Sequence, residues 1–173
     1  MPRPKLFFGK DQRGVAALEF AITAPIALLV LVNRYDFLSY VSRRMAVQDA
    51  VQMAVQAIRS TCDAAHVPAT TYCSSLNSAI TTAIQSTSFG NQITSAGAPA
   101  EDYYCVNSAS VLQHVSDVSH KPSDCRSVGT PTLTPGDYIR VQVQLSYKPI
   151  FAGSYAAALL TTPITGSAWM RLQ

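Results

Sequence analysis

The longest pattern in the chain is an apolar run followed by a helical repeat. Residues 15–32 hold seventeen uncharged residues and one glutamate, Glu19. Beyond this run, apolar side chains recur at steps of three and four residues, and neither Gly nor Pro interrupts residues 26–60. This spacing predicts one long helix, apolar at first and amphipathic afterwards, that ends near Ser60. Pro25 removes one backbone hydrogen bond in the apolar half, so we expect a kink or a loosened turn there.

A second pattern, with a period of two, appears towards the C-terminus. In residues 138–147 apolar and polar side chains alternate, which predicts a strand with one buried and one wet face, as in an antiparallel sheet packed on a helix. Residues 164–172 alternate more weakly and are expected to pair with it, and residues 102–107 also indicate a strand. A short helix is predicted over residues 74–86, and a loop over residues 119–136. The predicted fold class is α+β, with a long N-terminal helix packed against a small antiparallel sheet.

Charge separates the start of the chain from the rest. Residues 1–14 contain four of the 13 basic and one of the 10 acidic residues, and so carry the whole net charge of +3. The remainder is neutral, which argues against nucleic-acid binding. A short basic flank stays on the cytoplasmic side of a membrane, and the 18 residues of the apolar run would span about 27 Å of a hydrocarbon core of about 30 Å. We expect one crossing with the N-terminus inside; a buried core helix is the alternative.

The cysteines all follow the predicted crossing: Cys62, Cys73, Cys105 and Cys125. An even number in the translocated part predicts disulfide bonds in an oxidising compartment. Three connectivities are possible, and the sequential one, which joins the first to the second and the third to the fourth, is favoured because it closes short loops. A zinc site is the alternative, but the chain has no CxxC pair. We therefore predict no metal and no cofactor.

Groups that could support catalysis are few. The three histidines are scattered through polar segments: His66, His114 and His120. Residues 117–120 and the Asp124-Cys125 pair could form a metal site or a cysteine nucleophile, but Cys125 has three potential disulfide partners. No GxSxG, HExxH or phosphate-binding loop is present. The sequence therefore predicts that the chain is not an enzyme.

The junction between the basic segment and the apolar run has the properties of a cleavage site. A secretory signal peptide is cut after its apolar region, yet no small-residue site follows the run. Gly14, directly before the run, offers an unhindered backbone to a protease. Cleavage there would remove a leader, keep the membrane helix and leave Val15 with a free amine.

Placing Glu19 in an apolar membrane helix costs free energy. A carboxylate costs roughly 2.5–3.5 kcal/mol at the centre of a bilayer, and less near its surface. A helix places residues 15 and 19 on one face about a turn apart. Glu19 could therefore neutralise the Val15 amine of its own chain or that of a neighbouring helix, where it would act as a docking element. It could also simply reach the headgroup water.

The residues of this junction carry a resemblance to a known family. Residues 13–20, RGVAALEF, followed by an apolar stretch with Pro25, resemble the N-terminal signature of type IV pilin-like proteins, and in particular of TadE-like minor pilins (pseudopilins) of the tight-adherence, or Flp pilus, system. The alternating strand, the Pro-Ile-Phe segment and the last strand are similar more loosely. The resemblance covers roughly residues 10–60 and 136–172. Asn33 to Asp36 departs from it, since family members often have Gly and Glu there.

The resemblance implies a role in assembling Flp/Tad pili for adhesion or surface colonisation. A prepilin peptidase would cut between Gly14 and Val15, and Glu19 and Phe20 would align incoming subunits. The implied partners are this peptidase, other pilins and minor pilins, the inner-membrane assembly platform and membrane lipid. Because major pilins of this system are much shorter, a minor component that initiates, primes or tips the fibre is expected.

The implied location is the bacterial inner membrane, with one pass, a cytoplasmic N-terminus and a periplasmic head, or the pilus itself. The predicted domains are a leader at 1–14, a transmembrane helix at 15–33, an amphipathic stalk at 34–60 and a disulfide-containing head at 61–173. An uncleaved, membrane-anchored periplasmic binding module is the alternative function.

Overall fold

The computed structural model describes residues 13–62, 67–151, 160 and 162–173. Residues 1–12 of the predicted leader, and His66, lie outside the described residues. The chain divides into two compact units. The N-terminal unit comprises Met1–Ser39 and Pro149–Leu160, and the head unit comprises Tyr40–Lys148 and Thr161–Gln173. Each unit is described by itself.

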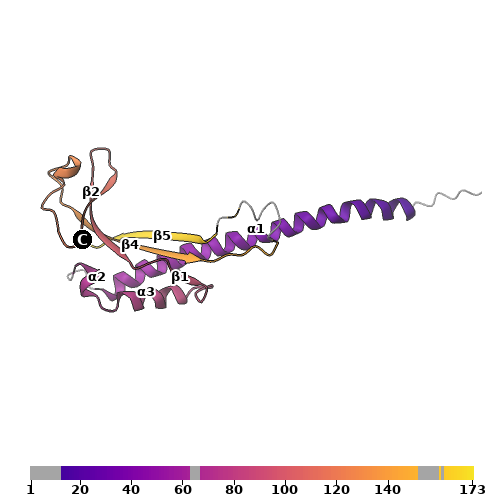
Figure 1. The fold of residues 1–173 in the computed structure, drawn as a ribbon, viewed down its shortest axis with the longest axis horizontal. Coiled ribbons are helices and arrows are strands. Elements are labelled where there is room, and N and C mark those ends of the chain that lie inside the picture. Colours follow the sequence, from indigo (N-terminus) through magenta and orange to yellow (C-terminus); the bar gives the residue numbers. More distant parts are fainter. Residues whose placement is uncertain (1–12, 63–66, 152–159, 161) are drawn as a thin grey trace, which may run out of the picture. The chain divides into compact units, whose positions relative to one another are not determined.

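One long helix, α1 (Arg13–Thr61), begins in the first unit and ends in the second (Figure 1). It has 49 residues and continues through Pro25. Its most apolar 18-residue window has a mean hydropathy of 2.4, and none of that window is buried. The predicted long helix is therefore confirmed, and it is long and apolar enough to cross a membrane. The crossing itself stays a prediction.

The sheet of the head unit is antiparallel and has five strands. They are β1 (Ile93–Ser95), β2 (Ala100–Val106), β3 (Leu112–Asp117), β4 (Gly136–Leu145) and β5 (Ile164–Arg171). The central strand, β4, pairs with β1 and β2 along one edge and with β5 along the other, while β3 forms a hairpin with β2. The α+β class, the antiparallel sheet and the pairing of the last two long strands are confirmed.

The core of the head unit lies between this sheet and the second half of α1. The residues on the inner face of β4 are at most 1% exposed: Ile139, Val141, Val143 and Leu145. On α1 the fully buried residues recur at helical spacing: Val47, Ala50, Val51, Ala54 and Ile58. The predicted alternation of β4 and the predicted amphipathic repeat are thus the two surfaces of one core.

Two short helices complete the head unit. The predicted second helix is α3 (Leu76–Gln85), which buries Leu76, Ile80 and Ile84 at steps of four residues. The other, α2 (Ala69–Tyr72), has four residues and no counterpart in the sequence pattern. The segment predicted as a loop contains a 3₁₀ turn over Arg126–Val128.

Candidate functional site

The predicted cleavage site lies at the start of the described part of α1. Gly14 and Val15 directly follow Arg13, the first described residue of this helix. The side chain of Val15 is 66% exposed. A Cβ added at Gly14 would meet nothing within 4 Å. The bond is therefore accessible, and a small side chain at Gly14 would not disturb the fold.

Glu19 and Phe20 follow on the same exposed part of the helix. Phe20 is 71% exposed, and the hydroxyl of Thr23 donates a hydrogen bond to the Glu19 carbonyl at 2.9 Å. Within the described part of the chain, the Glu19 carboxylate makes no hydrogen bond or ion pair. The Val15 amine with which it is predicted to pair exists only after cleavage, so that pairing stays a prediction.

Asp36, which the sequence places just beyond the apolar run, is a fully buried carboxylate of the N-terminal unit. Its Oδ1 accepts a hydrogen bond from the backbone N–H of Ile150 at 3.0 Å, and its Oδ2 accepts one from Phe151 at 3.2 Å. Asp36 thereby fastens the segment after β4 to α1.

All four cysteines are in disulfide bonds. Cys62 is joined to Cys73 and Cys105 to Cys125, which is the sequential connectivity. The first bond ties the end of α1 to the residue after α2, and the second ties β2 to the start of the 3₁₀ turn. The thiols are therefore not available as zinc ligands or nucleophiles. Among the described residues, no three His, Cys, Asp or Glu side chains gather as metal ligands.

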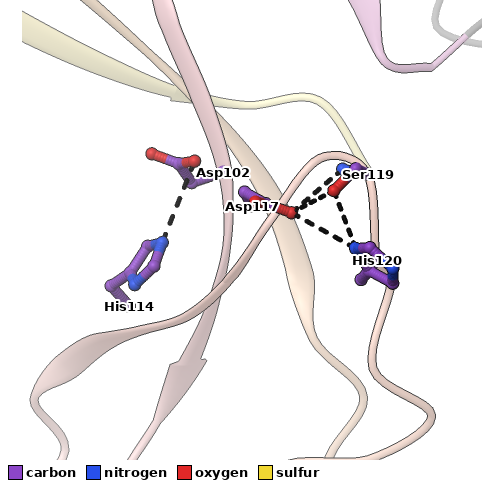
Figure 2. Close-up of polar contacts among 5 residues, drawn as sticks. All are labelled: Asp102, His114, Asp117, Ser119 and His120. Atoms are coloured by element: carbon purple, nitrogen blue, oxygen red, sulfur yellow. Dashed lines mark hydrogen bonds and ion pairs between the residues drawn. The ribbon is translucent and has the colours of Figure 1, made fainter.

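Two histidines lie in polar clusters on the β2–β3 hairpin and the turn after it (Figure 2). His114 is 3.8 Å from Asp102. In the turn, the Ser119 hydroxyl lies 2.7 Å from Nδ1 of His120 and donates to Asp117 at 2.5 Å. The hydrogen bond from the Ser119 hydroxyl is the main cause of the lowered pKa of Asp117.

This turn does not have the geometry of a hydrolytic triad. In a triad the serine and the carboxylate contact opposite nitrogens of the imidazole, so that one orients it while the other loses a proton to it. Here the Ser119 hydroxyl and the Asp117 carboxylate approach the same nitrogen of His120, and the side chains of Asp117 and His120 are 66% and 86% exposed. The cluster is a solvated turn, and the absence of enzymatic activity stays a prediction.

Glu101 is a buried carboxylate on the inner face of β2, with 5% of its surface exposed. It accepts hydrogen bonds from the backbone N–H groups of Ala69 and Thr70, both at 2.7 Å, and from the Thr70 hydroxyl at 2.6 Å. These amides belong to the first turn of α2, where no intrahelical acceptor exists. Glu101 therefore holds this four-residue helix against the sheet.

Asp137 lies beside Glu101 at the start of β4. It pairs in register with Tyr103 and is 1% exposed, and neither of its carboxylate oxygens has a hydrogen-bond partner among the described residues. Burial, followed by the charge of Glu101, raises the pKa of Asp137 to about 6. Asp137 therefore favours its neutral form beside the charge of Glu101.

The sequence contained a signal for these three buried acids that our reasoning missed. Each occupies a position in phase with apolar neighbours: Asp36 with the buried stripe of α1, Glu101 with Tyr103 on β2, and Asp137 with Ile139 on β4. A charge in phase with a core needs a partner or a proton.

Comparison of the chain with protein-family models, characterised proteins and solved structures finds no match.

Proposed function

We propose that this chain is a minor pilin or pseudopilin of an Flp/Tad pilus, cut after Gly14 by a prepilin peptidase and assembled through α1. The observation that carries the proposal is the contrast within one helix. One face of its second half is buried under the sheet, whereas the large apolar side chains of its first part, from Val15 to Leu31, are 59–71% exposed. Such a surface needs an apolar environment on every side. Lipid supplies it before assembly, and neighbouring helices supply it in a fibre.

The junction favours a pilin over a permanent anchor. A plain anchor needs no glycine before its apolar run and no carboxylate within it. Glu19 has no partner among the described residues, and the amine of a processed neighbouring chain would supply one. In the alternative, an uncleaved binding module, Glu19 would only reach headgroup water. The two disulfides fit assembly on the periplasmic side of the membrane.

Processing is tested by producing the full chain with and without a prepilin peptidase that cuts a known pilin in the same cells. We expect the intact mass of the membrane protein to fall by that of residues 1–14. Gly14→Ala should impair or abolish this loss while membrane insertion continues, because a Cβ at this position meets nothing within 4 Å. A wild-type chain that retains Met1 while the known pilin is cut would overturn the proposal in favour of the binding module.

Assembly is tested with Glu19→Ala. We expect normal cleavage but a loss of assembled subunit of about 3- to 20-fold, since polar pairs between membrane helices contribute about 0.6–1.7 kcal/mol. Thr23→Ala is the matched control, because it removes a polar group one turn away whose hydroxyl already bonds within the helix. Equal pilus assembly by Glu19→Ala and wild type would refute the docking role of Glu19.

A further inference from the structure

The turn of α1 that follows the apolar run has one polar face. Asp36 is fully buried, and Asn33 and Ser39, three residues to either side of it on the same face, are half-buried. The other side chains of this turn project into the surroundings: Tyr35, Phe37 and Leu38 are 58%, 55% and 56% exposed. The polar face is therefore covered, while the apolar ones are open.

The segment that lies on the polar face is itself apolar on its outer side. Ile150 and Phe151 use their backbone N–H groups to bind Asp36, yet their side chains are 62% and 44% exposed. The turn thus carries large apolar side chains both on the exposed faces of α1 and on the segment that covers its polar face. We call these five residues the collar: Tyr35, Phe37, Leu38, Ile150 and Phe151.

We propose that the collar is a membrane-interface anchor, in which Ile150 and Phe151 enter the lipid headgroup layer and Asp36 holds them against α1. This inference rests on the proposed insertion of α1 into a membrane. Asp36 lies four residues past Val32, the last residue of the apolar run, which is about 6 Å along a helix axis. The polar layer on each side of a bilayer is about 5–7 Å thick, so the collar falls within it.

The chemistry of the collar suits lipid better than water or a protein partner. Tyr side chains such as that of Tyr35 concentrate at the boundary between hydrocarbon and headgroups, and Phe and Leu side chains enter this boundary from amphipathic segments. Exposed Arg34 in the same turn can reach the phosphates. Backbone N–H groups lose hydration as they approach the hydrocarbon core, so acceptors within the chain allow a segment to lie deeper in this layer. The Asp36 carboxylate supplies them to Ile150 and Phe151, which lets an irregular segment lie at this depth.

Depth-dependent fluorescence quenching tests the inference on the full chain. Trp169 is the sole tryptophan, so Trp169→Phe provides a dark background into which Phe151→Trp is introduced. The chain is placed in phosphatidylcholine vesicles containing some phosphatidylglycerol, with bromine either near the headgroups or near the end of the acyl chains. We expect blue-shifted emission from Phe151→Trp and stronger quenching by the shallow bromine. Leu29→Trp is the deep reference, and Leu133→Trp, in the head unit, is the aqueous reference.

The outcomes separate this inference from the function on which it rests. If deep bromine quenches Leu29→Trp but neither bromine quenches Phe151→Trp, the collar is not in lipid and the inference is wrong, although the anchor stands. If Leu29→Trp is also unquenched, membrane insertion fails and both proposals fall. Blue-shifted emission from Phe151→Trp without quenching would mean that protein covers the collar, which also overturns the inference.

A second variant tests the role of Asp36. Asp36→Ala removes the acceptor for both N–H groups, so the Phe151→Trp reporter should lose its shallow quenching and shift to the red. Asp49→Ala removes an exposed carboxylate from the same helix and should leave the reporter unchanged. The Leu29→Trp reporter in the Asp36→Ala chain shows whether the helix still inserts. Unchanged shallow quenching in an inserted Asp36→Ala chain would contradict the holding role.

Discussion

Replacing Gly166 by valine is expected to destabilise the head unit by about 1–3 kcal/mol. A Cβ at this position on β5 would lie 2.8 Å from Cγ1 of Val47 and 3.0 Å from Cγ2 of Val51, both on α1, with the Val47 carbonyl oxygen at 3.5 Å. Valine in a helix has essentially one rotamer, so neither methyl group can swing aside. Helix and sheet would have to separate. Urea unfolding of the full chain in detergent, followed by the fluorescence of Trp169, measures the loss.

Valine normally stabilises a strand relative to glycine, by up to about 1 kcal/mol. A destabilising effect of Gly166→Val would therefore be opposite to the effect expected from strand propensity alone. Ser167→Val, on the exposed face of the same strand, is the matched control and should be neutral or slightly stabilising. Val47→Ala should restore part of the loss in a Gly166→Ala chain, since it removes the methyl group that the new Cβ meets. A stabilising Gly166→Val would show that α1 does not lie this close to β5.

This contact also shows which parts of the fold the sequence could predict. α1, α3 and β4 each bury one face, and the period of their apolar residues identifies both the element and the face. That information is local. The close approach of Gly166 to Val47 is not local, because it depends on the register of β5 on β4 and on the distance between the two layers.

The elements that sequence reasoning missed are held by partners far along the chain. β1 has three residues, and β3 buries none of its six, so neither has a period to detect; each exists because it pairs with a neighbouring strand. The four residues of α2 are fixed by Glu101, 31 and 32 residues away.

The candidate site divides in the same way. The junction from Gly14 to Phe20 is a contiguous motif and could be found in the sequence. Asp36 could be seen as a charge, but its partners lie 114 and 115 residues away, so its role could not be predicted. A useful rule emerges from Asp36 and Asp137: an acid in phase with a buried stripe indicates either a distant backbone donor or a bound proton.

We expect Asp137 to hold a bound proton in the folded chain. The head unit should therefore become less stable as rising pH removes this proton. Neither carboxylate oxygen has a hydrogen-bond partner among the described residues, and burial and the charge of Glu101 raise the pKa of Asp137 from 3.8 to about 6. The charge of Asp102 acts in the same direction, and that of Lys121 opposes it. The folded chain therefore binds a proton that the unfolded chain has already lost. The stabilisation is complete below about pH 4 and is lost as the pH rises through 6, by about 3 kcal/mol in all.

Asp137→Asn isolates this contribution, because asparagine resembles the protonated acid and can donate a hydrogen bond towards Glu101. The quantity to measure is the free energy of unfolding of Asp137→Asn minus that of the wild type, from urea titrations between pH 4 and 8, since the other groups cancel in the difference. We expect this difference to rise with pH and to level off above about pH 7. Asp137→Asn should therefore be the more stable chain at neutral pH.

Asp117→Asn is the contrasting control, because its sign is opposite. The Ser119 hydroxyl holds the pKa of Asp117 below its usual value, so the stabilisation from this exposed acid appears as the pH rises and is lost as it falls. The same difference for Asp117→Asn should therefore be flat between pH 4 and 8 and rise only when the titration is extended below about pH 4. If the difference for Asp137→Asn is flat between pH 4 and 8, water or a cation must reach Asp137 in solution, since an ionised carboxylate next to Glu101 is not stable there without one.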